Sequence, residues 1–364
     1  MISIDASILE PDSASFRRMA DYGSICEELH ILVLNGKGNR VKISENVFAY
    51  SVGTNFRFMA VFRAIRASKK ILSGAGKWII TTQDPFETGF IGWRLAKKFK
   101  VPLEIQMHGD FYGNKYWKKE NCINFFRFYL GKFILRRATS VRAVSERIKK
   151  SIEFFLKKDT KIFKNPILSE EKKQIVGENN LRKKYPNNFP IILAVGNLVP
   201  VKNHKMLIEV FSEIKKDFPE AKLIIVGDGH LLKSLQLTAL SFKLENDVEL
   251  AGHKDNLSDY YSSADIFIHP SLNEGWGRAV VEAATFGLPI IMSDVGLAGE
   301  LIKNNESGLV VPVNDKEALK DAIVKLAKDG AQRDRLGVNA KLAVLELLHK
   351  EEYLNEIKEA WSAI

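Results

Sequence analysis

The sequence predicts an α/β protein made of two doubly wound domains in tandem. Its 364 residues exceed the length at which one hydrophobic core usually suffices, so two domains are expected. Short apolar runs alternate with segments of helical periodicity, which is typical of βα units around parallel sheets. A polar segment at residues 168–189 interrupts this alternation, which then begins again. Two such domains would present two sets of strand ends across a cleft.

The first half begins with a very short strand and continues as βα units. Strands are expected at residues 1–4, 29–34, 47–52, 78–82, 103–107, 140–144 and 161–163. Helices are expected at residues 16–26, 56–72, 89–99, 122–137 and 146–156. Ser145 is a plausible N-cap for the last helix, and residues 35–38 form a turn.

The second half repeats this pattern after the polar segment, which we interpret as a linker with some helix. Strands are expected at residues 191–195, 222–226, 248–250, 266–269, 290–293 and 309–311. Helices are expected at residues 204–218, 316–328, 333–349 and 353–361, from after Gly229 to about Phe242, and at other places between the strands. The predicted domains are residues 1–168 and 169–344, and the C-terminal helix at 345–364 is expected to pack back on the first.

Composition is that of an ordinary globular protein, with 46% apolar and 27% charged residues. No apolar run approaches the roughly 20 residues of a membrane-spanning helix. The opening residues reach Asp5 too early for a signal peptide. Cys26 and Cys122 lie far apart, which favours two reduced thiols over a disulfide. We therefore expect a cytoplasmic protein, with possible peripheral contact at the inner face of the membrane.

Positive charge is concentrated in one stretch. Residues 91–164 contain 19 Lys and Arg against 6 Asp and Glu, whereas the remainder of the chain is slightly acidic. Such a stretch fits an anionic membrane surface, a phosphorylated lipid acceptor or nucleic acid, and solvated helix faces explain it equally well. Of these partners we expect no nucleic acid.

Two carboxylates eight positions apart mark the main candidate site. Glu274 and Glu282 enclose Gly275, Trp276, Gly277 and Arg278, between a predicted strand and a predicted helix. A glycine-bearing loop of this kind is where α/β domains bind ligands. We expect both carboxylates to hold hydroxyl groups of a nucleotide sugar. One alternative is that the two residues are the carboxylate pair of a glycosidase. Another is that neither binds a ligand, with Glu282 stabilising the helix start and Glu274 exposed in the loop.

The loop at residues 196–203 is the second candidate, because it follows a strand and opens a helix. Backbone amides at a helix N-terminus, together with Lys202, would form an anion site. A diphosphate leaving group needs such donors as its negative charge grows. An ordinary loop with a solvated lysine is the alternative. A glycosidase would not need this loop, which favours sugar transfer.

Three polar residues of the first half follow predicted strands. His108 could hydrogen-bond a sugar hydroxyl or a developing charge, and a packing or capping role is about as consistent. Asp110 could orient His108 or contact an acceptor. Asp84 could line the acceptor side, although local hydrogen bonds within a turn are the stronger interpretation.

Basic and aromatic residues interleave at residues 115–119 and 125–134, as they do at membrane interfaces. Phe125, Tyr129 and Phe133 recur at helical spacing. We therefore slightly favour a core helix with a basic outer face over membrane contact.

The sequence predicts neither a metal site nor a cofactor. It has no Asp-x-Asp pair, and His269 has no nearby partner in the sequence.

An ordered set of short motifs resembles glycosyltransferase family four, the retaining group 1 enzymes of the GT-B fold. The resemblance is strongest at residues 191–313 and looser at residues 143–146 and 165–166. Its motifs are residues 195–203, 224–229, 264–271, 274–277, 282–283, 287–291, 300–302 and 307–312. Each motif is weak alone, but their order and spacing together are specific.

The resemblance implies a hexosyltransferase-type enzyme that takes a UDP- or GDP-sugar as co-substrate, without a metal. It implies that Glu274 contacts the donor sugar, Glu282 the ribose and Lys202 the diphosphate. His108 matches the family's histidine near the reacting centre. The acceptor, a glycan or lipid-linked molecule of cell-surface polysaccharide biosynthesis, is implied mainly on the first domain.

The chain departs from the family pattern at two places. Asn197 stands where the family usually has an arginine, and Arg278 or Lys205 could substitute for it. The family's first glycine-rich loop is replaced by residues 7–15. Two alternatives therefore stay open, a sugar-nucleotide-binding subunit without catalysis and, less favoured, a sugar-nucleotide epimerase.

Overall fold

A computed structural model describes residues 1–35, 40–52, 57–72, 76–164, 180–347 and 349–364. The chain forms two compact units. The first comprises Met1–Pro166 and His349–Ile364, and the second comprises Ile167–Leu348. The predicted turn at residues 36–38 and linker residues 168–179 lie outside the described residues.

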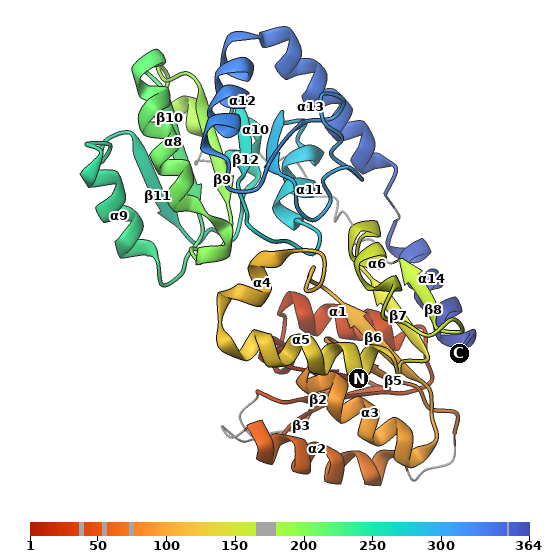
Figure 1. Ribbon diagram of the computed structural model, residues 1–364. Helices are drawn as coiled ribbons and strands as arrows, with labels where there is room; N and C mark the ends of the chain where they lie inside the picture. Colours follow the sequence, from red (N-terminus) through yellow and green to blue (C-terminus); the bar gives the residue numbers. More distant parts are fainter. Residues whose placement is uncertain (36–39, 53–56, 73–75, 165–179, 348) are drawn as a thin grey trace. The chain divides into compact units, whose positions relative to one another are not determined.

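The first unit is built on a twisted sheet with strand order β3-β4-β2-β1-β5-β6-β7-β8 (Figure 1). Its strands are β1 (Ile2–Ser3), β2 (Leu29–Val33), β3 (Arg40–Ser44), β4 (Val47–Ser51), β5 (Ile80–Thr82), β6 (Leu103–Met107), β7 (Ser140–Ala143) and β8 (Lys161–Lys164). Neighbouring strands are parallel except β3 and β4. Strand order reverses between β1 and β5, which makes this the switch point of the sheet.

Its helices connect these strands and cover the sheet. They are η1 (Ala6–Leu9), α1 (Ala14–Gly23), α2 (Arg57–Leu72), α3 (Glu87–Phe99), α4 (Lys115–Glu120), α5 (Cys122–Leu135), α6 (Glu146–Glu153) and the C-terminal α14 (Lys350–Ser362). In α14, Ile357 is fully buried in the core cluster beside β2 and β4. The Tyr353 hydroxyl lies 2.8 Å from the Tyr22 hydroxyl of α1. The C-terminal helix therefore completes the hydrophobic core of the first unit.

The second unit contains a parallel sheet with strand order β11-β10-β9-β12-β13-β14. Its strands are β9 (Ile191–Val195), β10 (Lys222–Val226), β11 (Val248–Gly252), β12 (Ile266–His269), β13 (Ile290–Ser293) and β14 (Leu309–Val311). Its helices are α7 (Leu181–Lys184), η2 (Pro200–Lys202), α8 (His204–Asp217), α9 (Leu232–Ser241), α10 (Ser258–Ser263), α11 (Arg278–Thr285), α12 (Lys316–Lys328) and α13 (Gly330–Leu345). The central strands are buried almost throughout, as continuous apolar runs in parallel sheets require. The switch point lies between β9 and β12.

The predicted α/β class with doubly wound sheets is confirmed, but some elements differ from expectation. Strand β3 was missed, although Val41 and Ile43 alternate with basic residues, because it is an antiparallel strand at the sheet edge. Helix α4 was missed because it is short and buries no residue.

Four helices, α1, α3, α13 and α14, begin two or three residues earlier than predicted, and side-chain caps explain two of these differences. The Ser13 side chain accepts a hydrogen bond from the Phe16 amide and starts α1 at Ala14. In the same way Asp329 caps α13, which begins at Gly330 and ends at Leu345. Within the described residues, no helix is both long and apolar enough to cross a membrane.

Candidate functional site

The two candidate loops of the second unit meet at the switch point of its sheet. Strand β9 leads into the loop containing Asn197 and Lys202, and the adjacent β12 leads into the loop containing Glu274. Neighbouring parallel strands place their carboxyl ends side by side, so residues about seventy positions apart come together. Lys202 Nζ forms an ion pair with Glu274 Oε1.

Glu274 is held through one oxygen only. Besides Lys202, Oε1 accepts hydrogen bonds from His269 Nε2 and Ser271 Oγ, each at 2.9 Å. Within the described chain, Oε2 has no hydrogen-bond donor. The expectation that His269 lacks a nearby partner was wrong, because the loop after β12 turns Glu274 back over the strand end. The carboxylate is thus fixed in place while one oxygen stays available.

Glu274 is ionised at any ordinary pH. Desolvation alone would raise its pKa, but the hydrogen bond and charge of His269 and the ammonium group of Lys202 outweigh it. Together they lower the pKa of Glu274 to about 2. A fixed carboxylate of this kind can accept hydrogen bonds from hydroxyl groups.

The loop around Asn197 depends on a close backbone approach. Gly227 has φ +148°, and a Cβ at this position would lie 2.0 Å from the carbonyl oxygen of Gly196. The Leu198 amide donates to the Asp228 carbonyl at 2.8 Å, which fixes the loop to the end of β10. Asn197 is exposed, and the Asn203 side chain does not cap α8. The N-terminus of α8 therefore keeps the donor character expected of an anion site.

The remaining predicted residues of this site lie on or before α11. Gly277, at φ +109°, precedes the helix, and Arg278 is its exposed first residue. Glu282 Oε2 accepts a hydrogen bond from the Tyr261 hydroxyl at 3.0 Å. Gly275 is buried in the loop, and the Trp276 side chain is only 3% exposed. The indole of Trp276 therefore packs inside, and contact with a ligand through this ring is not favoured.

In the first unit, a chain of hydrogen bonds determines the tautomer of His108. The buried Glu104 carboxylate pairs with Arg142 at 3.0 Å and accepts the Thr81 hydroxyl proton at 2.6 Å. Thr81 Oγ1 therefore accepts from Gln106 Nε2 at 2.8 Å, which directs the Gln106 carbonyl oxygen to His108 Nε2, also at 2.8 Å. Because an amide oxygen only accepts, His108 carries its proton on Nε2. Its Nδ1 remains an acceptor.

His108 is neutral at neutral pH. Desolvation, followed by the positive charges of Arg142 and Arg18, lowers the pKa of His108, although the residue as a whole is exposed. A neutral ring whose Nδ1 has no partner among the described residues can accept a hydrogen bond from a hydroxyl group.

The two predicted acceptor-side aspartates are engaged locally. Asp110 Oδ1 accepts from the Gly113 amide at 2.7 Å, so the suggestion that Asp110 orients His108 was wrong and Gln106 has that role. Asp84 Oδ1 accepts from the Phe86 amide at 2.7 Å, as the turn interpretation predicted. Burial raises the pKa of Asp84 to about 6 and also raises that of Asp110.

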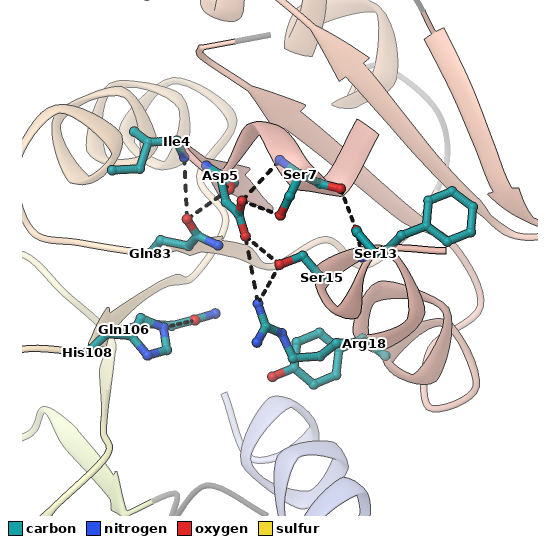
Figure 2. A network of polar contacts seen from close by, with 12 residues as sticks. Ile4, Asp5, Ser7, Ser13, Ser15, Arg18, Gln83, Gln106 and His108 are labelled. Carbon is teal, nitrogen blue, oxygen red and sulfur yellow. Dashed lines mark hydrogen bonds and ion pairs between the residues drawn. The ribbon is translucent and has the colours of Figure 1, made fainter. Parts of the chain in front are cut away.

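A polar cluster at the switch point of the first sheet was not foreseen. Figure 2 shows its side chains, those of Asp5, Ser7, Ser15, Arg18 and Gln83, together with His108. We call these first five residues the Asp5 cluster. Asp5 follows β1 and Gln83 follows β5, so the position of polar residues after adjacent strands was the available signal.

The aromatic residues of α5 lie on its outer face. Phe125, Tyr129 and Phe133 are 46%, 53% and 39% exposed, and Phe126 is 72% exposed. The favoured interpretation of a core stripe was therefore wrong. The helix packs inward through Gly131 instead, where a Cβ would lie 2.0 Å from the Tyr112 hydroxyl oxygen.

Cations cover part of this aromatic face. Lys118 Nζ lies 4.4 Å from the Phe128 ring centroid, and the Arg137 guanidinium carbon lies 3.4 Å from that of Phe133. In the described ranges, no group of three or more His, Cys, Asp or Glu side chains could hold a metal ion.

Comparisons with known proteins agree with this architecture. The family model described as glycosyl transferases group 1 matches residues 177–343. An uncharacterized glycosyltransferase of Methanocaldococcus jannaschii is 26% identical over 86% of this chain and 84% of its own length. The capsular polysaccharide biosynthesis glycosyltransferase CapM of Staphylococcus aureus is 25% identical over 87% of this chain and 86% of its own.

Solved structures share the fold over the whole chain. Sucrose-phosphate synthase from Thermosynechococcus elongatus has a TM-score of 0.81 at 20% identity, covering 100% of this chain and 98% of its own. Anabaena HepE in complex with UDP and glucose has a TM-score of 0.76 at 17% identity, covering 100% and 99%. Fold and relatives together define a glycosyltransferase of the GT-B fold. Within this class, the second unit is similar to the group 1 glycosyltransferases, since that family model matches residues 177–343 of this chain.

Proposed function

We propose that the protein is a retaining, metal-independent hexosyltransferase that uses a UDP- or GDP-sugar. It extends a glycan or lipid-linked acceptor in cell-surface polysaccharide biosynthesis. The observation that carries the proposal is the Lys202–Glu274 pair at the β9–β12 switch point. The relatives support it, since one is named for capsular polysaccharide biosynthesis and another transfers galactose from UDP-Gal to a diphosphoundecaprenol acceptor. HepE also binds UDP-glucose.

In this proposal the second unit holds the donor. Lys202 leaves Glu274 and neutralises the diphosphate, assisted by backbone amides at the start of α8. Glu274 stays fixed by His269 and Ser271 and accepts hydrogen bonds from donor-sugar hydroxyls. Glu282 accepts from the ribose hydroxyls.

The transfer itself needs no nucleophile from the protein. The acceptor hydroxyl attacks the anomeric carbon on the face from which the diphosphate departs. The bond from that carbon to the phosphate oxygen breaks as the new glycosidic bond forms, and the hydroxyl proton passes to the departing phosphate oxygen. His108 Nδ1 accepts a hydrogen bond from a sugar hydroxyl.

The alternative function is a sugar-nucleotide-binding subunit without turnover. Asn197 favours it, because an exposed amide replaces the planar guanidinium that would clamp a diphosphate. In the transferase proposal, Arg278 supplies this charge from the start of α11.

A panel of UDP- and GDP-sugars tests both functions. We expect one donor to raise the melting temperature, because ligand binding stabilises the folded state by mass action, and to be consumed when acceptor extracts are added. Lys202→Ala and Glu274→Ala should lower transfer about 100-fold or more with the fold intact. The exposed residues Lys233 and Glu245 provide matched alanine controls.

Two results would contradict the transferase assignment. Near-normal transfer by both site variants would contradict the assignment of Lys202 and Glu274 to the active site. Tight donor binding without turnover on any acceptor would favour the binding subunit. If no nucleotide sugar binds, both functions are wrong.

We further propose that the aromatic face of α5 contacts the inner face of an anionic membrane. Exposed aromatic rings flanked by Lys118, Lys132 and Arg137 match the mixed polarity of a lipid interface. The variant carrying Phe125→Ser, Phe126→Ser and Tyr129→Ser should lose sedimentation with anionic vesicles at low salt. The control variant with Leu237→Ser and Leu240→Ser, both exposed on α9, should retain it. Absence of binding by the unmodified protein would count against the proposal.

A further inference from the structure

The Asp5 cluster lies where a doubly wound sheet binds ligands. Strands β1 and β5 are neighbours at the switch point, and β6, which leads to His108, is next to β5. Ligands of open α/β sheets bind outside the carboxyl ends of strands at this point. In the second unit the same position contains the proposed donor site.

The carboxylate of Asp5 is already satisfied within the cluster. Its Oδ1 accepts from the Ser7 amide at 3.1 Å and the Ser7 hydroxyl at 2.6 Å, and its Oδ2 accepts from Ser15 Oγ at 2.6 Å. Desolvation alone would raise its pKa, but these hydrogen bonds and the Arg18 charge lower the pKa of Asp5. Asp5 therefore builds the loop and is not available to bind a ligand.

Arg18 keeps most of its donors. Its Nη2 lies 3.9 Å from Asp5 Oδ2 and 3.4 Å from Ser15 Oγ, both at the limit of a useful interaction. In the part of the chain that the structure describes, its Nε and Nη1 make no hydrogen bond. The side chain is 45% exposed. A planar guanidinium with free donors fits an oxyanion, which it can bind through two parallel hydrogen bonds.

Gln83 adds a second donor. Its Oε1 accepts from Ser3 Oγ at 2.8 Å and from the Ile4 amide at 3.3 Å, which leaves Nε2 without a described partner. Figure 2 shows this nitrogen on the side of the amide that faces Ser15 and Arg18. His108, from the next strand end, contributes Nδ1 as an acceptor. The group thus offers donors for an anion and one acceptor for a hydroxyl.

We propose that Arg18 and Gln83 form a subsite for an oxyanion, a phosphate or carboxylate group of the acceptor, beside the hydroxyl that His108 receives. This rests on the proposed function for its acceptor, but the subsite is a property of the first unit alone. A neutral glycan would leave the guanidinium donors unmatched, so the subsite selects acceptors that carry negative charge near the reacting sugar.

The test titrates small anions into the full chain and follows the Nε–Hε signal of Arg18 by NMR. Methyl phosphate and acetate represent the two oxyanions, and glycerol is the neutral control. UDP is present at saturation, and the titration is repeated with Lys202→Ala, so that the diphosphate site does not contribute. We expect saturable shifts with methyl phosphate or acetate and none with glycerol.

Variants on the same helix make the assignment specific. These variants lack the Arg18 signal, so they and the unmodified protein are compared through the side-chain amide signal of Gln83. Arg18→Gln should weaken anion binding at least tenfold and Arg18→Lys less, because an ammonium group lacks the planar fork. Arg17→Gln, whose side chain donates to the Asp12 carbonyl on the exposed surface, should bind as the unmodified protein does. Equal anion binding by Arg18→Gln and the unmodified protein, or no saturable shift at all, would overturn the proposal.

Geranyl phosphate identifies the source of the anion. Binding at least tenfold tighter than that of methyl phosphate indicates a lipid-borne phosphate, and equal binding indicates a water-soluble acceptor. Both outcomes support the subsite. The UDP-induced rise in melting temperature should be the same in Arg18→Gln, since UDP binds the second unit. A missing response to both UDP and GDP would therefore refute the proposed function, while the anion titration still decides the subsite.

Discussion

At the scale of single residues, hydrogen-bond logic determines the chemistry of His108. Thr81 is the deciding residue, because its hydroxyl must donate to the Glu104 carboxylate and can only accept from Gln106. Neither Thr81 nor Gln106 has any feature in the sequence that marks it as functional. Both lie on neighbouring strands whose register brings them together.

Replacing Thr81 with valine should release the tautomer of His108. The variant keeps the shape but leaves Gln106 Nε2 without its acceptor, so the amide can turn and Nδ1 can become protonated. A histidine-selective ¹⁵N NMR spectrum should show the change. Loss of this one hydrogen bond, worth about 1 kcal/mol, should lower kcat roughly fivefold at unchanged donor KM.

The control is Thr82→Val, on the same strand, whose hydroxyl donates to the Asp84 carbonyl at 3.2 Å. It should leave the His108 tautomer as it is. An unchanged tautomer in Thr81→Val would show that this network does not determine it.

His204 should make the stability of the second unit depend on pH. Burial, followed by the charges of His269 and Lys202, lowers the pKa of His204 to about 4 from a usual value near 6.5. Between these values the unfolded chain binds a proton that the folded unit excludes. Stability is therefore fully present above pH 6.5 and falls as the pH drops towards 4.

Urea denaturation of the unmodified protein and His204→Leu can measure this effect. The stability advantage of the unmodified protein should be about 2 kcal/mol smaller at pH 5 than at pH 7.5. A difference between the two proteins that stays constant with pH would contradict the assignment of this titration to His204.

At the scale of elements, α14 holds the first unit together from the far end of the sequence. Trp361 Nε1 donates to Glu104 Oε1 at 3.3 Å, and Ile357 is buried in the core. The helix thereby reaches the same carboxylate that orders Thr81. The amphipathic C-terminal segment predicted a helix that packs on the first domain, but nothing in its sequence specified the contact with Glu104.

A chain ending at Leu347 should lose the folded first unit and keep the second. Hydrogen exchange should show protection lost in β2, β4 and β6 and retained in β9 and β10. The milder variant Trp361→Phe removes only the indole donor and should destabilise the first unit by about 1–3 kcal/mol. If truncation leaves exchange in β2 and β6 unchanged, α14 is dispensable for the core.

At the scale of the whole molecule, the two units differ in how the chain builds them. The second is one continuous segment, Ile167–Leu348, whereas the first is closed by residues from both ends. A fragment of residues 167–348 should therefore fold alone, and it should bind UDP or GDP with at least part of the affinity of the full chain. It should not transfer sugar, because His108 and the Asp5 cluster are absent. Calorimetry and thermal shift with the fragment measure both properties.

A fragment that remains unfolded would contradict the independence of the second unit. A folded fragment that fails to bind any nucleotide bound by the full chain would instead contradict the position of the donor site.

The sequence by itself determined the α/β class, the repeated strand pattern and the resemblance to a known family. These depend on local periodicity and on the spacing of motifs such as the one around Glu274. Both can be read from the sequence without knowledge of the fold. It also indicated Lys202 and Glu274 as ligand-binding residues, but in two separate motifs whose direct contact it did not predict.

The tertiary structure decided which side chains meet. The ion pair of Lys202 with Glu274, the contact of His269 with that carboxylate and the Asp5 cluster all arise where adjacent strands end at a switch point. Strand order is a property of long-range packing, which no local sequence pattern encodes. For the same reason the aromatic stripe of α5 was assigned to the core, since periodicity shows that Phe125 and Tyr129 share a face but not which way that face points.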